Sequence, residues 1–164
     1  MHGGQRRADE RGQAGGIETI AFGLLAFVVG TLLLANAWGV VDAKLAASAA
    51  AREAVRAYVE APETSTGSVS QIDGAERARA AARAAIAGHG RDPDRLTLDV
   101  ALDDPARGYS RCNVVTVVVR YPVPAVALPS IGGIGHGFTA VGRHTERVDP
   151  LRAGIPGAAR CDGP

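Results

Sequence analysis

Aromatic side chains are scarce in this chain of 164 residues. Phe, Trp and Tyr together make up 4% of the sequence, whereas Gly alone contributes 21 residues. Small apolar side chains such as Ala and Val bury less area than Leu or Phe, and each buried Å² contributes roughly 25 cal/mol. We therefore expect the soluble part of the chain to be only marginally stable by itself.

An excess of charge of one sign is also missing. Lys and Arg total 18, Asp and Glu total 17, and the formal net charge is +1. Such a chain has no overall field that would attract a polyanion. Nucleic acid is therefore not an expected partner.

Cysteine is limited to two residues, Cys112 and Cys161, whose spacing is not that of metal ligands. If this region lies outside the cytoplasm, a disulfide that ties the C-terminal tail to the body is the favoured interpretation. Two unrelated free thiols are the alternative.

Charged side chains are absent from Thr19 to Val41, where the sequence is otherwise almost entirely apolar. As a helix this segment would be roughly 34 Å long at 1.5 Å per residue, which suffices to cross a hydrocarbon core of ~30 Å. It is apolar on all sides, and Trp38 lies near its end, where an indole suits the headgroup region. The segment predicts a transmembrane helix in contact with the lipid bilayer.

The residues that flank this segment indicate its orientation. Arg6, Arg7 and Arg11 precede it, whereas Asp42 and Lys44 follow it without net charge. The positive-inside rule places the N-terminus in the cytoplasm. We thus expect a single-pass protein of the cell membrane, with the residues after about 42 outside the cytoplasm.

A second topology remains open. Ala35-Asn36-Ala37 is an A-x-A pattern, so that signal peptidase could cut after Ala37 and release a secreted or envelope domain that acts as a binding module. The apolar pattern, however, continues to Val41 and then passes without a break into an Ala-rich helix, which favours an anchored chain.

The sequence pattern divides the chain into four parts: a cytoplasmic basic leader (1–16), a transmembrane helix with an extracytoplasmic extension (17–61), a small extracytoplasmic α+β domain (62–149) and a loosely ordered tail (150–164). In the extension, which ends before Pro62, one side with helical spacing is expected to carry the domain: Leu45, Ser48, Arg52, Val55 and Val59.

The domain is expected to be small and of mixed class. Asp73 to Gly88 predicts a second helix, with an apolar stripe of Ala78, Ala82, Ala85 and Ile86. Leu96–Leu102 and Asn113–Tyr121 predict a β-hairpin, and Phe138–Val148 a third strand. The fold class is therefore α+β: a long N-terminal helix extends into a pilin-like domain with a short antiparallel sheet of about three strands.

No group of residues predicts catalysis. Gly132 to Gly137 does not match a nucleotide-binding loop and is expected to be a flexible connection, and Asp99, Asp103 and Asp104 lack the spacing of a calcium loop. The four histidines are scattered. We therefore expect no enzyme activity, cofactor, metal ion or small-molecule substrate.

Glu18 is the most informative single residue, because it lies at the start of the apolar segment. A carboxylate there must stay near the interface or be paired. Either it is a favourable acidic residue in the first turn of the helix, or it pairs with a cationic group of a neighbouring subunit during assembly.

Three stretches give the chain a family resemblance. They are Arg11 to Thr19, with Arg-Gly, small residues and then Ile-Glu; the Ala-Arg-Glu block from Ala49 to Arg56; and the valine-rich stretch from Asn113 to Pro122, followed by Leu128-Pro129. In their order and spacing they resemble the TadE/TadG-like family of tight-adherence (Flp) pilus assembly proteins, which are minor pseudopilins.

The resemblance implies a membrane-inserted subunit that assembles with other pilus or pseudopilin subunits and with an assembly platform. It also implies maturation by a prepilin peptidase, for which Gly12 is the candidate processing position. Cutting after Gly12 would leave Glu18 as the sixth residue, where the family has the fifth, and the family's usual proline in the membrane segment is missing.

Overall fold

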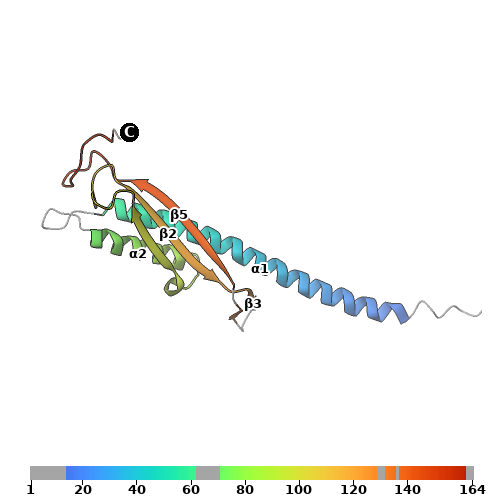
Figure 1. Ribbon diagram of the computed structural model, residues 1–164. Helices are drawn as coiled ribbons and strands as arrows, with labels where there is room; N and C mark the ends of the chain where they lie inside the picture. Colours follow the sequence, from blue (N-terminus) through green and yellow to red (C-terminus); the bar gives the residue numbers. More distant parts are fainter. Residues whose placement is uncertain (1–13, 62–70, 129–131, 136, 162–164) are drawn as a thin grey trace, which may run out of the picture. The chain divides into compact units, whose positions relative to one another are not determined.

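The computed structural model describes residues 14–61, 71–128, 132–135 and 137–161 (Figure 1). It divides into two compact units, of which unit 1 ends at Trp38 and unit 2 begins at Gly39. The elements in chain order are α1 (Ala14–Val59), α2 (Gln71–Gly88), the 3-10 turn η2 (Pro93–Arg95), β1 (Thr97–Leu102), β2 (Val114–Val123), β3 (Val126–Leu128), β4 (Gly132–Ile134) and β5 (Phe138–Arg147).

Helix α1 belongs to both units. It begins at Ala14, three residues before the expected start at Ile17, and ends at Val59, close to the expected stop before Pro62. No proline interrupts it, and Ala and Leu, which favour helices, are frequent along it. The expected continuous helix through the apolar segment and its extension is confirmed.

Unit 2 consists of a three-stranded antiparallel sheet in the order β1-β2-β5, which packs against α2 and the second half of α1. Alternate residues of the central strand β2 are at most 7% exposed and face the helices: Val115, Val117, Val119, Tyr121 and Val123. On α2, Ala78, Ala82 and Ile86 are buried, as the stripe predicted. The α+β class and the predicted hairpin and third strand are confirmed.

The face that α1 turns to the domain differs from the expected one. Leu45 is 60% exposed and Arg52 is exposed, although both belong to the predicted stripe; Val55 and Val59 are buried as predicted. The buried face consists mainly of alanines: Ala43, Ala46, Ala47, Ala50, Ala51 and Ala54. Small side chains allow the helix backbone to approach the sheet, and this close approach decides which face is buried.

Gly142 on β5 is where helix and sheet come closest. A Cβ atom at this position would overlap the carbonyl group of Ala47 and lie 2.7 Å from the backbone nitrogen of Ser48. One turn earlier, Lys44 Nζ donates a hydrogen bond to the carbonyl oxygen of Val141. Glycine at this strand position is therefore required for α1 to lie against β5.

Two expectations need correction. Helix α2 starts at Gln71, two residues before Asp73. The Gly-rich connection is not wholly irregular, because Gly132–Ile134 forms β4 and pairs with β3 in a second, two-stranded sheet. Backbone hydrogen bonds need no side chain, so glycines can form this short ladder. His136 lies outside the described residues.

We predict that Gly142→Ala lowers the free energy of unfolding of unit 2 by about 1–3 kcal/mol, because the added methyl group must push α1 away from β5. Thermal unfolding of the purified protein, followed by circular dichroism, measures this loss. Gly88→Ala is the matched control, since nothing lies within 4 Å of a Cβ there. Equal stability of the two variants would contradict the close contact.

Candidate functional site

The apolar part of α1 is the first candidate region. Among the described residues, α1 is the one helix long and apolar enough to span a membrane. Most of its large apolar side chains from Ile20 (73%) to Trp38 (69%) are exposed, and Leu32 is half-buried. The coarser expectation, one helix able to span a membrane near the N-terminus, is confirmed, and its orientation stays a prediction.

Polar side chains inside this segment bond to the helix itself. Thr31 Oγ1 donates to the carbonyl oxygen of Phe27 at 2.8 Å, and Asn36 Nδ2 donates to that of Leu32 at 2.8 Å. In lipid an unsatisfied polar group is costly. These bonds along the helix make the segment compatible with an apolar surrounding.

Glu18 lies in the second turn of α1, and its side chain is exposed. Because the helix starts at Ala14, its first turn contains no acidic residue. The favourable effect of the helix dipole falls off within the first turn. The interpretation of Glu18 as a first-turn acid is therefore weakened. Gly12, the candidate processing position, lies outside the described residues.

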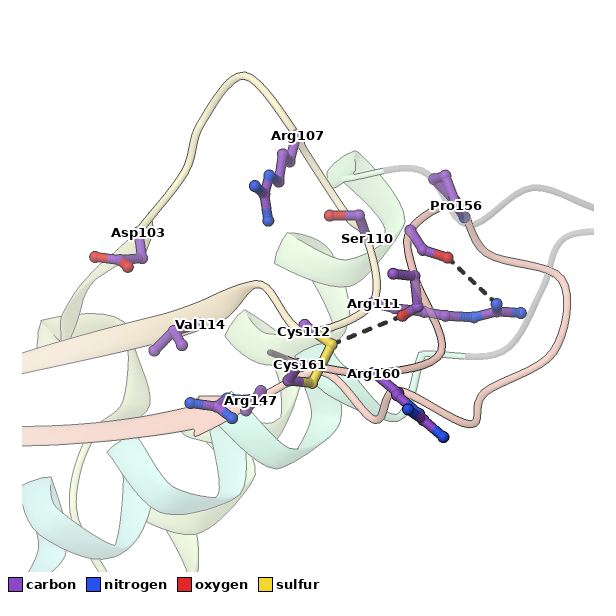
Figure 2. Close-up of a pocket in the computed structure, with 12 residues that line it drawn as sticks. Asp103, Arg107, Ser110, Arg111, Cys112, Val114, Arg147, Pro156, Arg160 and Cys161 are labelled. Carbon is purple, nitrogen blue, oxygen red and sulfur yellow. Dashed lines mark hydrogen bonds between the residues drawn. A yellow bond between two sulfur atoms is a disulfide. The ribbon is translucent and has the colours of Figure 1, made fainter. Parts of the chain in front are cut away.

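The second candidate region is a cavity of about 790 Å³ beside the cysteines of unit 2 (Figure 2). Four arginines contribute to its lining together with Asp103 and Ser110: Arg107, Arg111, Arg147 and Arg160. The buried Ser110 hydroxyl has no hydrogen-bond partner within the described part of the chain.

Asn113 shapes the loop on one side of this cavity. Its buried side chain donates to the carbonyl oxygens of Asp104 (2.9 Å) and Gly108 (2.8 Å), and its Oδ1 accepts from the backbone N–H groups of Asp104 and Val114. A buried amide with all these partners fixes the loop. From the sequence pattern, Asn113 is predicted only as the first residue of a strand.

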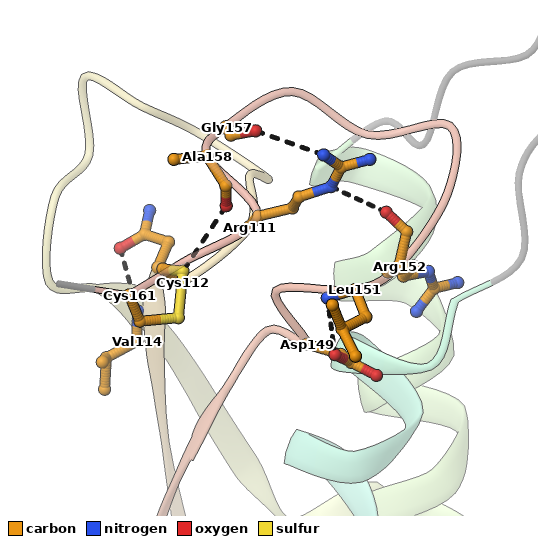
Figure 3. Close-up of a disulfide and its surroundings, with 10 residues drawn as sticks. Arg111, Cys112, Val114, Asp149, Leu151, Arg152, Gly157, Ala158 and Cys161 are labelled. Carbon is orange, nitrogen blue, oxygen red and sulfur yellow. Dashed lines mark hydrogen bonds between the residues drawn. A yellow bond between two sulfur atoms is a disulfide. The ribbon is translucent and has the colours of Figure 1, made fainter.

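The C-terminal tail forms the other side, and Figure 3 shows how it is held. Cys112 and Cys161 are joined by a disulfide with Cα atoms 5.2 Å apart, as favoured from the sequence. Arg111 donates to the carbonyl oxygens of Arg152 (2.7 Å) and Gly157 (3.3 Å). Residues 148–161 contain no helix or strand, yet Ile155 is 6% exposed. The tail, expected to be loosely ordered, thus packs against the body.

Two of the arginines that line the cavity are held by neighbouring groups. Arg107 forms an ion pair with Asp104 at 2.9 Å, and Arg111 donates hydrogen bonds to carbonyl oxygens of the tail. In Figure 2 the guanidinium groups of Arg147 and Arg160 point away from each other. The Ser110 hydroxyl has no hydrogen-bond partner, and so no base beside it, among the described residues.

The three acidic residues considered for a calcium site make different contacts. Asp99 pairs with Arg120 across β1 and β2, while Asp104 accepts backbone hydrogen bonds in its own turn. Asp103 lines the cavity. Over the described ranges, no group of three or more His, Cys, Asp or Glu is arranged to hold a metal ion.

The end of α1 is fixed by side chains far away in the sequence. Tyr109 donates its hydroxyl to the carbonyl oxygen of Val59 at 2.6 Å, and its ring lies 5.6 Å from that of Tyr58. Arg152 donates to the carbonyl oxygens of Val59 and Ala61. Burial raises the pKa of both tyrosines. No local pattern could have revealed this cluster, because its members meet only in the fold.

Comparison with known proteins gives no further guidance, because no known protein family, curated protein or solved structure matches this chain.

We predict that Cys112→Ser combined with Cys161→Ser lowers the stability of unit 2. The disulfide closes a loop with a sequence separation of 49 residues, for which the chain-entropy model gives about 4 kcal/mol. Thermal unfolding with and without dithiothreitol measures the effect. Reductant should lower the midpoint of the wild type and leave that of the double variant unchanged, whereas equal midpoints for the two proteins in the absence of reductant would contradict the prediction.

Proposed function

We propose that this protein is a TadE-like minor pseudopilin or assembly component of a tight-adherence (Flp) pilus or a related secretion system. It acts by helix packing, without catalysis. The observation that carries the proposal is the single helix α1, whose first part is apolar and exposed and whose second part forms one side of a small domain.

The side chains of α1 differ between its first part, up to Trp38, and its second part, from Ala43 onward. From Ile20 to Trp38 its exposed side chains are large and apolar, which suits lipid or neighbouring helices. From Ala43 onward its buried side chains are mostly alanine, which suits close packing on a sheet. A helix that serves as anchor and as domain core supports a pilin-type subunit, by analogy of architecture.

Two of the three stretches that carry the family resemblance lie in unit 2 and have structural roles there. In the block from Ala49 to Arg56, Ala50, Ala51, Ala54 and Val55 are buried against the domain, while the charged residues are exposed. The valine-rich stretch from Asn113 is β2, the central strand. The resemblance in unit 2 thus coincides with its core, where it supports the fold more directly than the function.

Glu18 is the residue to which we assign a role in assembly. Its carboxylate is exposed in the second turn of α1, at the edge of the apolar segment. At the edge of a bilayer such a group gains from a cationic partner on a neighbouring subunit. With the predicted orientation, in which the N-terminus is in the cytoplasm, this pairing is expected on the cytoplasmic side.

We predict that Glu18→Gln reduces filament assembly about tenfold, which corresponds to the loss of ~1.4 kcal/mol at the subunit contact. Filaments sheared from cells that express the cognate assembly genes, quantified against the membrane fraction, provide the measurement. Glu53→Gln is the matched control, because Glu53 is exposed on the same helix beyond the apolar segment. Unchanged assembly by the Glu18 variant would remove the assigned role.

The alternative is a secreted or envelope domain released after Ala37, and the intact mass of the mature protein separates the two proposals. Because α1 continues through Ala37 as regular helix, we predict that the mature chain retains residues 19–41 and is recovered from the membrane fraction. A mature chain that begins at Trp38 and is recovered from the medium would overturn the pseudopilin proposal in favour of the secreted domain.

A further inference from the structure

The cavity of about 790 Å³ in unit 2 concentrates positive charge (Figure 2). Its lining contains one negative side chain, Asp103, and four positive ones. The positive side chains come from three segments: Arg107 and Arg111 from the loop between β1 and β2, Arg147 from the end of β5 and Arg160 from the tail. The whole chain has a net charge of only +1. Folding thus gathers charge here that the composition does not reveal.

Two of these arginines have unused hydrogen-bond donors. Among the described residues, Arg147 and Arg160 form no ion pair and no hydrogen bond, and both are exposed. Arg111, by contrast, donates through Nε and Nη1 to carbonyl oxygens of the tail. A guanidinium is a planar fork of donors that fits the oxygens of a phosphate or carboxylate group. The two unpaired arginines are therefore available to an oxyanion in the cavity.

The hydroxyl of Ser110 is an independent indication of a ligand. Ser110 is 4% exposed and lines the cavity, and its Oγ has no hydrogen-bond partner within the described part of the chain. In Figure 2 this hydroxyl and the Arg107 guanidinium lie on the same side of the loop that joins β1 to β2. A buried hydroxyl without a partner costs free energy. A bound group that accepts a hydrogen bond from Ser110 would remove this cost.

The size of the cavity and the directions of its arginines indicate the class of ligand. Sites for small organic molecules have volumes of roughly 300–1,000 Å³, and this cavity lies within that range. The guanidinium groups of Arg147 and Arg160 point away from each other (Figure 2), so one charged group does not engage both. A ligand that uses both arginines has at least two anionic groups on one small body.

From these observations we propose that the cavity binds a small polyvalent oxyanion, a molecule with two or more phosphate or carboxylate groups. Arg147 and Arg160 bind its charged groups, and the Ser110 hydroxyl donates to one of its oxygens. The Cys112–Cys161 disulfide joins the tail to the loop and so holds both walls around the ligand. This site lies entirely within unit 2 and goes beyond the proposed function, because it does not depend on how α1 meets a membrane.

Isothermal titration calorimetry of the full chain in a neutral detergent tests this site, with inorganic pyrophosphate and citrate as probes at constant ionic strength. We expect saturable binding. Arg147→Gln and Arg160→Gln should each weaken it about tenfold, as expected for the loss of one hydrogen bond to a charged group. Arg143→Gln is the matched control, because Arg143 is exposed on the same strand and is not part of the lining. Its affinity should stay within about twofold of the wild type.

Ser110→Ala separates a role in binding from a role in the fold. The variant should weaken binding about fivefold. The thermal midpoint of the ligand-free protein should stay the same or rise, because the hydroxyl has no partner to lose among the described residues. A lower midpoint with unchanged binding would overturn the assignment of Ser110 to the site.

The remaining outcomes decide whether the site exists and what it binds. No saturable binding of either probe at millimolar concentration would overturn the proposal. Equal losses for Arg143→Gln and Arg147→Gln would also overturn it, since they would indicate general attraction of anions. Acetate that binds as tightly as citrate would overturn the need for two anionic groups. Binding of pyrophosphate alone assigns the site to phosphate groups, and binding of citrate alone assigns it to carboxylates. These measurements do not involve filament assembly, so their failure leaves the proposed function in place.

Discussion

The close approach of α1 to β5 is the constraint on which unit 2 depends. Gly142 leaves room for the carbonyl group of Ala47, and a row of alanines on α1 meets the valines of β2. Two backbones can lie this near to each other only where side chains are small. These small side chains also limit the apolar area that unit 2 can bury, since Ala contributes far less area than Leu or Phe.

Specific polar contacts and one covalent bond compensate for the small core. Asn113 fixes the loop before β2, Tyr109 and Arg152 hold the end of α1, and the Cys112–Cys161 disulfide retains the tail. The contacts of Asn113 lie within its own loop, whereas Tyr109, Arg152 and the disulfide join segments that are distant in the sequence. Each of them reduces the freedom of a loop or terminus that packing alone would leave loosely held. The cavity lined by arginines lies between the tail and the loop before β2, which the disulfide joins.

The two parts of α1 suit different surroundings, because the side chains change along the helix while the backbone stays helical throughout. Large apolar residues up to Trp38 suit contact with lipid or other helices, and alanines from Ala43 onward suit contact with a sheet. Arg91, Asp42 and Gly39 are joined at the start of unit 2, where the folded domain begins. The proposed assembly role of Glu18 follows from a chain that is organised around this helix.

Periodicity and composition suffice to predict the apolar helix, the second helix, the hairpin and the third strand, because these depend on local patterns over a few turns or strand residues. The two cysteines also suggested their pairing, since they were the only two thiols. The tertiary structure alone decided that α1 is buried through its alanines while Leu45 and Arg52 face outward. It also decided that Gly132–Ile134 pairs as a strand, and that Tyr109 and Arg152 close the end of α1. The buried face of α1 depends on which backbones approach closely, and the closure of its end depends on groups more than 40 residues apart in the sequence. No local pattern contains that information, and the short β3–β4 ladder rests on backbone pairing that glycine residues do not signal.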